Sequence, residues 1–226
     1  MADRTTLEIA DGIAWVTLDD GKVNAMSMEM MSEIEAALDE AEAAGAVTVL
    51  TGRTGIFSAG FDMGTLGSGL DAARAMVLQG ARLIERLLSF PQPVVTACTG
   101  HAYPMGAFLM LAADSRFGVY GEFRIGMNET AIGLTIPLFA IELARHRLSP
   151  AGLARVTTAA MFDPEEALRL GYLDRVVEAD RLRAEVEEEA ERLLALDRPS
   201  VTATKARVNA PALAAIRSAI EAELAA

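Results

Sequence analysis

Residues 98–133, CTGHAYPMGAFLMLAADSRFGVYGEFRIGMNETAIG, decide the fold of this chain and carry its candidate chemistry. They begin at the end of an apolar segment, VVTAC (94–98), that is typical of a buried strand. The chain then turns and enters Met105–Ala113, which contains no charged residue. A surface helix needs a polar face, so this composition predicts a buried helix in the middle of the domain, closed by Asp114.

Two features of this stretch are able to support chemistry. Pro104 favours the first turn of the helix, where the N–H groups of Met105 and Gly106 have no acceptor inside the helix and suit an oxyanion. Glu129 stands among apolar and glycine residues, where burial raises the pKa of a carboxyl group toward neutrality. Ordinary interpretations stay open, because a strand–turn–helix with proline is common and a glutamate of this kind also suits a plain loop.

Composition bounds the class of protein. The chain has 226 residues, of which 52% are hydrophobic, enough for one sizeable core. A net charge of −12 argues against nucleic acid and anionic membrane as partners. Its one cysteine, Cys98, falls in the apparent buried strand, which excludes an intrachain disulfide and predicts a reducing, cytoplasmic setting.

The sequence contains no motif for a metal site, a nucleotide-binding loop or a membrane span. Two histidines and one cysteine without close acidic spacing do not indicate a metal site. No glycine-rich nucleotide fingerprint is present. The sequence has no apolar run long enough to span a bilayer and no apolar core of a signal peptide at its start.

Alternating strand and helix patterns predict an α/β fold with mostly parallel strands and a helical tail. Asp11-Gly12 predicts a hairpin, Asn24 is the expected turn residue of the next loop, and Ser27 is the expected N-cap of a helix. Strands are expected at 6–10, 13–18, 46–50, 94–98, 116–120, 123–125 and 172–177. Helices are expected at 28–44, 71–89, 105–113, 137–147, 150–159, within 162–171, at 181–196, and from 199 to the end with an interruption near Pro211. We expect a core over residues 1–195 and a C-terminal helical segment over 196–226.

A second glycine-bearing segment, FSAGFDM (57–63), follows a basic glycine turn. Glycine between apolar residues lets the backbone approach a ligand closely, although a plain turn fits the pattern as well. Gly64–Gly69 is expected to be a flexible edge of a pocket.

Three motifs together resemble the crotonase, or enoyl-CoA hydratase/isomerase, superfamily over roughly residues 5–210. Phe57–Asp62 resembles its first oxyanion segment, and Gly100–Ala107 with Asp114 resembles the second. Residues 162–177, with Glu166-Ala167 and Gly171-Tyr172-Leu173, resemble its acid-Ala, Gly-Leu-Val segment. The resemblance implies a crotonase-like spiral of β-β-α units with a helical C-terminal trimerisation region.

The resemblance also implies a site for an acyl-CoA thioester. The backbone N–H groups of Phe61 and Met105 are the implied oxyanion hole. The implied substrate-binding residues are Ala59, Gly60, Asp62, Met63, Gly106 and Phe108, with Lys22, Arg53 and Lys205 as candidates for the CoA phosphates. Coenzyme A enters as part of the substrate, and no permanently bound cofactor or metal is expected.

One departure from the family pattern narrows the expected reaction. Hydratases of this family use two glutamates, and Phe108 stands where the first is expected, whereas the second matches Glu129. The sequence around Glu129 is more similar to the Δ3,Δ2-enoyl-CoA isomerases of fatty acid β-oxidation, which use one. The resemblance therefore implies an isomerase with Glu129 as the proton shuttle, since one carboxylate suffices to move a proton from C2 to C4.

Other interpretations stay open. The chain is alternatively an enoyl-CoA hydratase or another crotonase-type enzyme, or a non-catalytic acyl-CoA-binding protein. His101 and Cys98 are interpreted as a loop residue and a core residue, since closeness in sequence is no catalytic geometry. A homotrimer, doubled in some members to a hexamer, is the oligomer that the resemblance implies.

Overall fold

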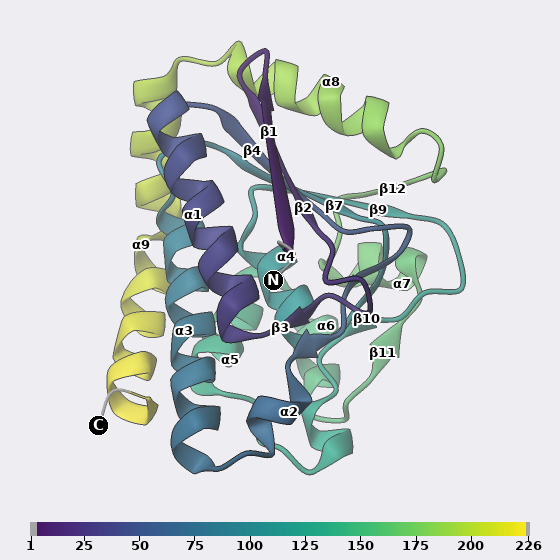
Figure 1. Ribbon diagram of the computed structural model, residues 1–226, viewed down its shortest axis with the longest axis vertical. Helices are drawn as coiled ribbons and strands as arrows, with labels where there is room; N and C mark the ends of the chain where they lie inside the picture. Colours follow the sequence, from purple (N-terminus) through teal and green to yellow (C-terminus); the bar gives the residue numbers. More distant parts are fainter. Residues whose placement is uncertain (1–3, 225–226) are drawn as a thin grey trace.

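A computed structural model describes residues 4–224 and places a six-stranded sheet between layers of helices (Figure 1). Its first pair of strands is antiparallel, and every later pair is parallel. The strands lie in the order β1 (Thr5–Ala10), β2 (Ile13–Leu18), β4 (Val47–Thr51), β7 (Val94–Cys98), β9 (Ser115–Val119) and β12 (Arg175–Val177).

Two smaller sheets carry the segments that matter for the site. One has the order β11 (Met161–Phe162), β10 (Ile125–Gly126), β8 (Gly100–Ala102) and β5 (Gly55–Ser58). Within it, β5, β8 and β10 are parallel. The other pairs β3 (Ala25–Met26) with β6 (Gly60–Phe61). Of these strands, β3, β6, β8 and β11 were not expected from the sequence, because two or three residues give no periodic pattern.

The helices are α1 (Met28–Ala44), α2 (Met63–Leu66), α3 (Leu70–Ser89), α4 (Pro104–Ala112), α5 (Leu138–Arg147), α6 (Pro150–Val156), α7 (Pro164–Leu170), α8 (Leu182–Leu194) and α9 (Arg198–Glu223), with a 3₁₀ turn η1 (Glu129–Ile132). One face of the main sheet packs on α8 through a cluster that includes Trp15, Val95 and Phe117. On the other side, α9 runs along α3 and packs on both α3 and α5 (Figure 1). No helix within residues 4–224 is long and apolar enough to cross a membrane.

The predicted buried helix is confirmed. Every residue of α4 from Met105 to Ala112 is buried, and Pro104 occupies its first turn. Other local predictions are also confirmed: Ser27 caps α1 by accepting from the N–H of Met30, and Asn24 has a positive φ of 53°. The Asp11-Gly12 hairpin joins β1 and β2 with positive φ at both residues, as the Asp-Gly pattern requires.

Several expectations were wrong in detail. α9 runs through Pro211 without interruption, because buried residues on both sides of the proline, Asn209 and Leu213 among them, hold the helix against its neighbours. The expected flexible edge at 64–69 instead begins within the short helix α2. The last strand covers only Arg175–Val177, α6 ends at Val156, and the strand expected at 123–125 lies at Ile125–Gly126. The division of the chain at residue 195 stays a prediction.

Candidate active site

The carboxyl ends of β5, β8 and β10 carry the three segments singled out in the sequence. Gly60-Phe61 follows β5, the first turn of α4 follows β8, and Glu129 follows β10 after Met127 and Asn128. Because these three strands are parallel neighbours, their carboxyl ends meet at one edge of the small sheet. The topology therefore brings together residues that are far apart in the sequence.

Gly60 lies directly against the first turn of α4. Its φ is +92°, a conformation that residues with a side chain rarely adopt. A Cβ atom added to it would lie 3.5 Å from Pro104 Cδ and 3.7 Å from the backbone nitrogen of Met105. The glycine thus lets the segment after β5 turn beside the exposed N–H groups of the helix.

Hydrogen bonds fix the two segments to each other. The Ser58 hydroxyl donates to the Asn24 carbonyl at 2.7 Å and accepts from the Gly60 N–H at 3.1 Å, while the Tyr103 N–H donates to the Ser58 carbonyl at 2.9 Å. A Cβ on Gly106 would lie 2.9 Å from Ser58 Cβ, closer than real contacts allow. Gly106 is therefore required for the close packing of α4 on β5.

Two backbone N–H groups are directed into the space beside these segments. The Asp62 N–H donates to the Met26 carbonyl of β3, and successive N–H groups of a strand point to opposite sides, so the N–H of Phe61 points away from β3. Within residues 4–224 the N–H of Met105 has no acceptor, as expected for the second residue of a helix. Both groups suit an oxygen atom that develops negative charge.

Glu129 is the carboxylate at this edge. It begins the 3₁₀ turn η1 and is only 7% exposed. Its Oε2 atom is buried and has no hydrogen-bond partner among the described residues. Burial raises the pKa of Glu129 from 4.5 to about 7, although a backbone hydrogen bond acts in the opposite direction. A carboxyl group with this pKa can both accept and release a proton near neutral pH.

Phe108 occupies the core beneath the first turns of α4. It is completely buried and packs edge-on against Phe139, with ring centroids 5.7 Å apart. It offers no titratable atom as a companion to Glu129.

The remaining residues of the predicted pocket, Ala59, Asp62 and Met63, lie within the segment 57–63. Asp62 caps α2, since its carboxylate accepts from the Thr65 N–H at 2.7 Å. Met63, the first residue of α2, is 61% exposed. The Ala59 N–H donates to the Val23 carbonyl at 2.9 Å, which ties this segment to the loop before β3.

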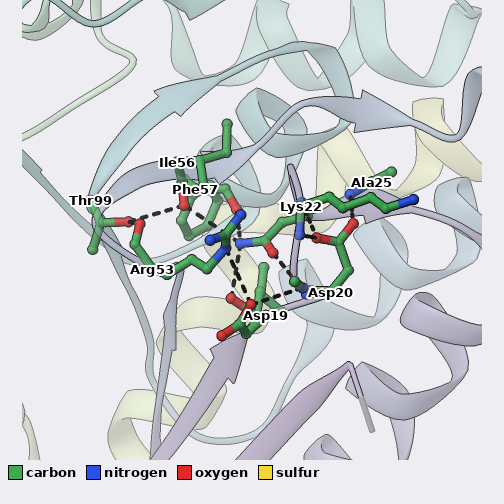
Figure 2. Close-up of polar contacts among 11 residues, drawn as sticks. Asp19, Asp20, Lys22, Ala25, Arg53, Ile56, Phe57 and Thr99 are labelled. Carbon is green, nitrogen blue, oxygen red and sulfur yellow. Dashed lines mark hydrogen bonds and ion pairs between the residues drawn. The ribbon is translucent and has the colours of Figure 1, made fainter. Parts of the chain in front are cut away.

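Lys22 lies in that loop and Arg53 lies beside it, and the Lys22 ammonium group is directed away from Arg53 (Figure 2). Arg53 forms an ion pair with Asp19 at 3.2 Å, whereas Lys22 forms none with any residue that the structure describes. The Asp20 carboxylate holds the loop by accepting N–H groups of Lys22 and Ala25. Burial raises the pKa of Asp20, but these donors and the Arg53 charge outweigh it and keep the pKa below its ordinary value. Lys22 is therefore the freer of the two cations for a ligand.

Lys205 lies elsewhere, and its expected place among the phosphate-binding cations does not fit the structure. Its ammonium group donates to Asp114 at 2.6 Å and to the Gln92 carbonyl at 3.2 Å, and the residue is 9% exposed. Burial lowers the pKa of Lys205, which the Asp114 charge partly opposes. The ion pair joins α9 to the end of α4, a contact that no local sequence pattern reveals.

Two polar groups of the candidate site, the Asn24 amide and the Tyr172 hydroxyl, were missed in the sequence analysis. The side-chain amide of Asn24, expected only as a turn residue, donates to the carbonyls of Leu18 and Phe57 at 2.8 and 3.2 Å. The hydroxyl of Tyr172 is buried near Glu129 and raises no signal in the sequence, because a tyrosine in an apolar segment is indistinguishable from a core residue.

Comparison with known proteins identifies the family. A family model described as enoyl-CoA hydratase/isomerase matches residues 8–226. The chain belongs to the enoyl-CoA hydratase/isomerase family. Its fold is the crotonase fold that the three sequence motifs led us to expect.

Known proteins that resemble this chain are named as hydratases or as isomerases. A probable enoyl-CoA hydratase of Mycobacterium avium is 34% identical over 206 residues, which is 88% of this chain and 79% of the relative. An enoyl-CoA hydratase/isomerase family protein from Pseudomonas syringae has a TM-score of 0.97 at 42% identity, covering 99% of this chain and 97% of the other. The apo structure of an enoyl-CoA isomerase of Mycobacterium tuberculosis has a TM-score of 0.93 at 38% identity, covering 98% and 97%.

Proposed function

We propose that this acyl-CoA-processing enzyme is a Δ3,Δ2-enoyl-CoA isomerase in which Glu129 is the single proton shuttle. The observation that carries the proposal is one buried carboxylate of raised pKa at the sheet edge that also carries the free N–H groups of Phe61 and Met105. Phe108 stands in place of a second acid. Moving a double bond from C3 to C2 needs one base that takes a proton and returns it. Hydration also needs a group that orients water, and paired carboxylates suit that task better.

In the proposed reaction the thioester oxygen accepts hydrogen bonds from the N–H groups of Phe61 and Met105. Glu129, as the carboxylate, takes a proton from C2, and the electrons of that C–H bond delocalise into a dienolate. The two N–H donors stabilise the charge on its oxygen, and such a donor commonly contributes about 3 kcal/mol. Glu129 then returns the proton to C4 as the double bond forms between C2 and C3.

The outer part of the substrate has candidate contacts of its own. We assign the CoA phosphates to Lys22 and Arg53, because Lys22 has no ion-pair partner among residues 4–224 and both cations border the loop before β3. Coenzyme A is then a part of the substrate, and no other cofactor enters the reaction. A homotrimer, with a hexamer as its doubled form, and a cytoplasmic location remain part of the proposal.

Enoyl-CoA hydratase is the second candidate, because several relatives bear that name. In that case Glu129 activates water without a second carboxylate. A non-catalytic acyl-CoA-binding protein is the third.

Paired absorbance assays distinguish the three. One cuvette contains a 3-enoyl-CoA and records the appearance of the conjugated 2-enoyl thioester; the other contains a 2-enoyl-CoA and records its loss by hydration. The isomerase gains signal in the first and is silent in the second. Glu129→Gln abolishes the gain, whereas Glu122→Gln, which changes an exposed glutamate on the other side of β10, leaves it unchanged. Loss of signal in the second cuvette contradicts the proposal in favour of a hydratase, and silence in both with acyl-CoA bound favours a binding protein.

A further inference from the structure

Two buried oxygen atoms, one in Glu129 and one in Tyr172, lack hydrogen-bond partners among the described residues. Glu129 Oε2 and the hydroxyl of Tyr172 are both inaccessible, and neither has a partner within hydrogen-bond distance among the described residues. Buried polar atoms are normally paired, so each requires an explanation. The two atoms interact electrostatically, since Glu129 contributes, after burial, to raising the pKa of Tyr172. The hydroxyl therefore keeps its proton and is a donor, while the carboxylate is an acceptor.

The scaffold places the Tyr172 ring next to the strand that leads to Glu129. Tyr172 packs against Phe162 with ring centroids 5.7 Å apart, and Phe162 pairs with Ile125 of β10. β10 then continues to Glu129. The ring thus packs on β11, the neighbour of the strand that leads to Glu129.

The backbone on both sides of Tyr172 is firmly held. The Tyr172 N–H donates to the Ala167 carbonyl at 2.9 Å. Gly171 before it has a φ of +95°, and its carbonyl accepts from Arg116 at 2.5 Å. Tyr172 itself is completely buried. A phenylalanine would fill the same space without burying a hydroxyl, and the Gly-Leu-Val motif that this segment resembles has leucine there, so packing alone does not account for the phenol.

We propose that Tyr172 is a positioning residue, whose hydroxyl donates through one bridging water molecule to Oε2 of Glu129 and so holds the carboxylate for proton transfer from its other oxygen. The inference rests on the proposed function. A bridge is the natural form, because the two oxygens lie beyond direct hydrogen-bond distance and each needs a partner. It leaves Oε1 free to meet the substrate.

Charged groups on the neighbouring elements are already engaged. Arg155 of α6 pairs with Glu166 of α7, and Arg116 of β9 pairs with Asp174 just after Tyr172. α4 contributes no titratable side chain to this region. No charged side chain is among the causes that shift the pKa of Glu129. Among the described residues, the Tyr172 hydroxyl therefore meets no competing charged partner at this carboxylate.

The test compares Tyr172→Phe with Tyr120→Phe, which removes the hydroxyl of a tyrosine that is 46% exposed. A donor to a carboxylate favours its ionised form, so its loss raises the pKa of Glu129 by about one unit. We expect the acidic limb of kcat/KM for the 3-enoyl-CoA to move to higher pH by that amount in Tyr172→Phe. Activity at pH 6 then falls about tenfold, with KM nearly unchanged. Tyr120→Phe keeps the wild-type profile.

A second measurement does not depend on turnover. Infrared titration of the protonated carboxyl band, assigned by its absence in Glu129→Gln, gives the pKa of Glu129 in wild type and in Tyr172→Phe. A band that titrates at the same pH in both proteins overturns the inference, even if the enzyme isomerises as proposed. If the band titrates at higher pH in Tyr172→Phe than in wild type but the wild-type protein has no isomerase activity, the hydrogen bond is supported and the proposed function is refuted.

Discussion

Replacing Glu129 by glutamine is expected to stabilise the protein at high pH. Burial raises the pKa of this carboxyl group from 4.5 to about 7, so the folded protein holds a proton that the unfolded chain releases. The resulting stabilisation is fully present below pH 4.5 and is lost as the pH rises through 7. Each unit of pKa difference corresponds to about 1.36 kcal/mol, which makes the total roughly 3 kcal/mol at pH 8.

Glutamine is neutral at every pH, so a protein with glutamine at this position does not lose stability in this way as the pH rises. About 0.8 kcal/mol of this contribution is already lost at pH 5, so the free energy of unfolding of Glu129→Gln, relative to wild type, is expected to be about 2.5 kcal/mol higher at pH 8 than at pH 5. This corresponds to roughly 5–10 °C in melting temperature for a protein of this size. Comparing the two pH values removes any packing effect of the substitution that does not depend on pH.

Urea denaturation of wild type, Glu129→Gln and Glu122→Gln at both pH values measures the difference. The exposed Glu122 serves as the matched control and should give no pH-dependent gain. A Glu129→Gln curve that follows wild type at both pH values would refute the reasoning, because it would mean that the carboxylate is hydrated in the folded protein.

Three further outcomes follow from the same geometry. Isomerisation by the wild-type enzyme should rise with pH, because Glu129 acts as a base only when deprotonated. The value of kcat/KM at pH 6 should be about one-tenth of its plateau above pH 8. A flat profile from pH 5 to 9 would exclude Glu129 as the base. Gly106→Ala forces a Cβ to within 2.9 Å of Ser58, and should cost about 1–3 kcal/mol of stability by denaturation and displace the start of α4, which lowers kcat. Lys22→Ala should raise KM for acyl-CoA and leave kcat unchanged. Lys205→Met should leave KM unchanged and lower the free energy of unfolding by about 2 kcal/mol, since the partner of Lys205 is Asp114. Equal effects of the two variants on KM would contradict the assignment.

Local patterns predicted the parts of the site that depend on neighbouring residues. The uncharged run of α4, the proline at its start and the hydroxyl cap of α1 each follow from a few consecutive residues, and all three are present. Gly60 was recognisable because a glycine between apolar residues favours close backbone approach, and its positive φ fits that expectation. The three segments of the candidate site came together only through the parallel pairing of β5, β8 and β10, which no local pattern contains.

Features that depend on distant partners escaped prediction. Lys205 looks like any surface lysine until α9 carries it to Asp114, 91 residues away in the chain. The helix continues through Pro211 because packing on α3 and α5 offsets the missing backbone hydrogen bond. The Tyr172 hydroxyl is relevant to the site only because its ring packs on Phe162 of β11, which pairs with the strand that leads to Glu129.

The most direct test of the account follows a labelled proton. A 3-enoyl-CoA deuterated at C2 is isomerised in ordinary water in a single turnover, and the deuterium content at C4 of the product is measured by mass spectrometry. If Glu129 alone takes the deuteron and returns it, a substantial part of the label appears at C4, because a carboxyl group only 7% exposed exchanges slowly with solvent. Product that contains only solvent hydrogen at C4 would contradict the single-carboxylate shuttle and indicate that a second acid or water delivers the proton.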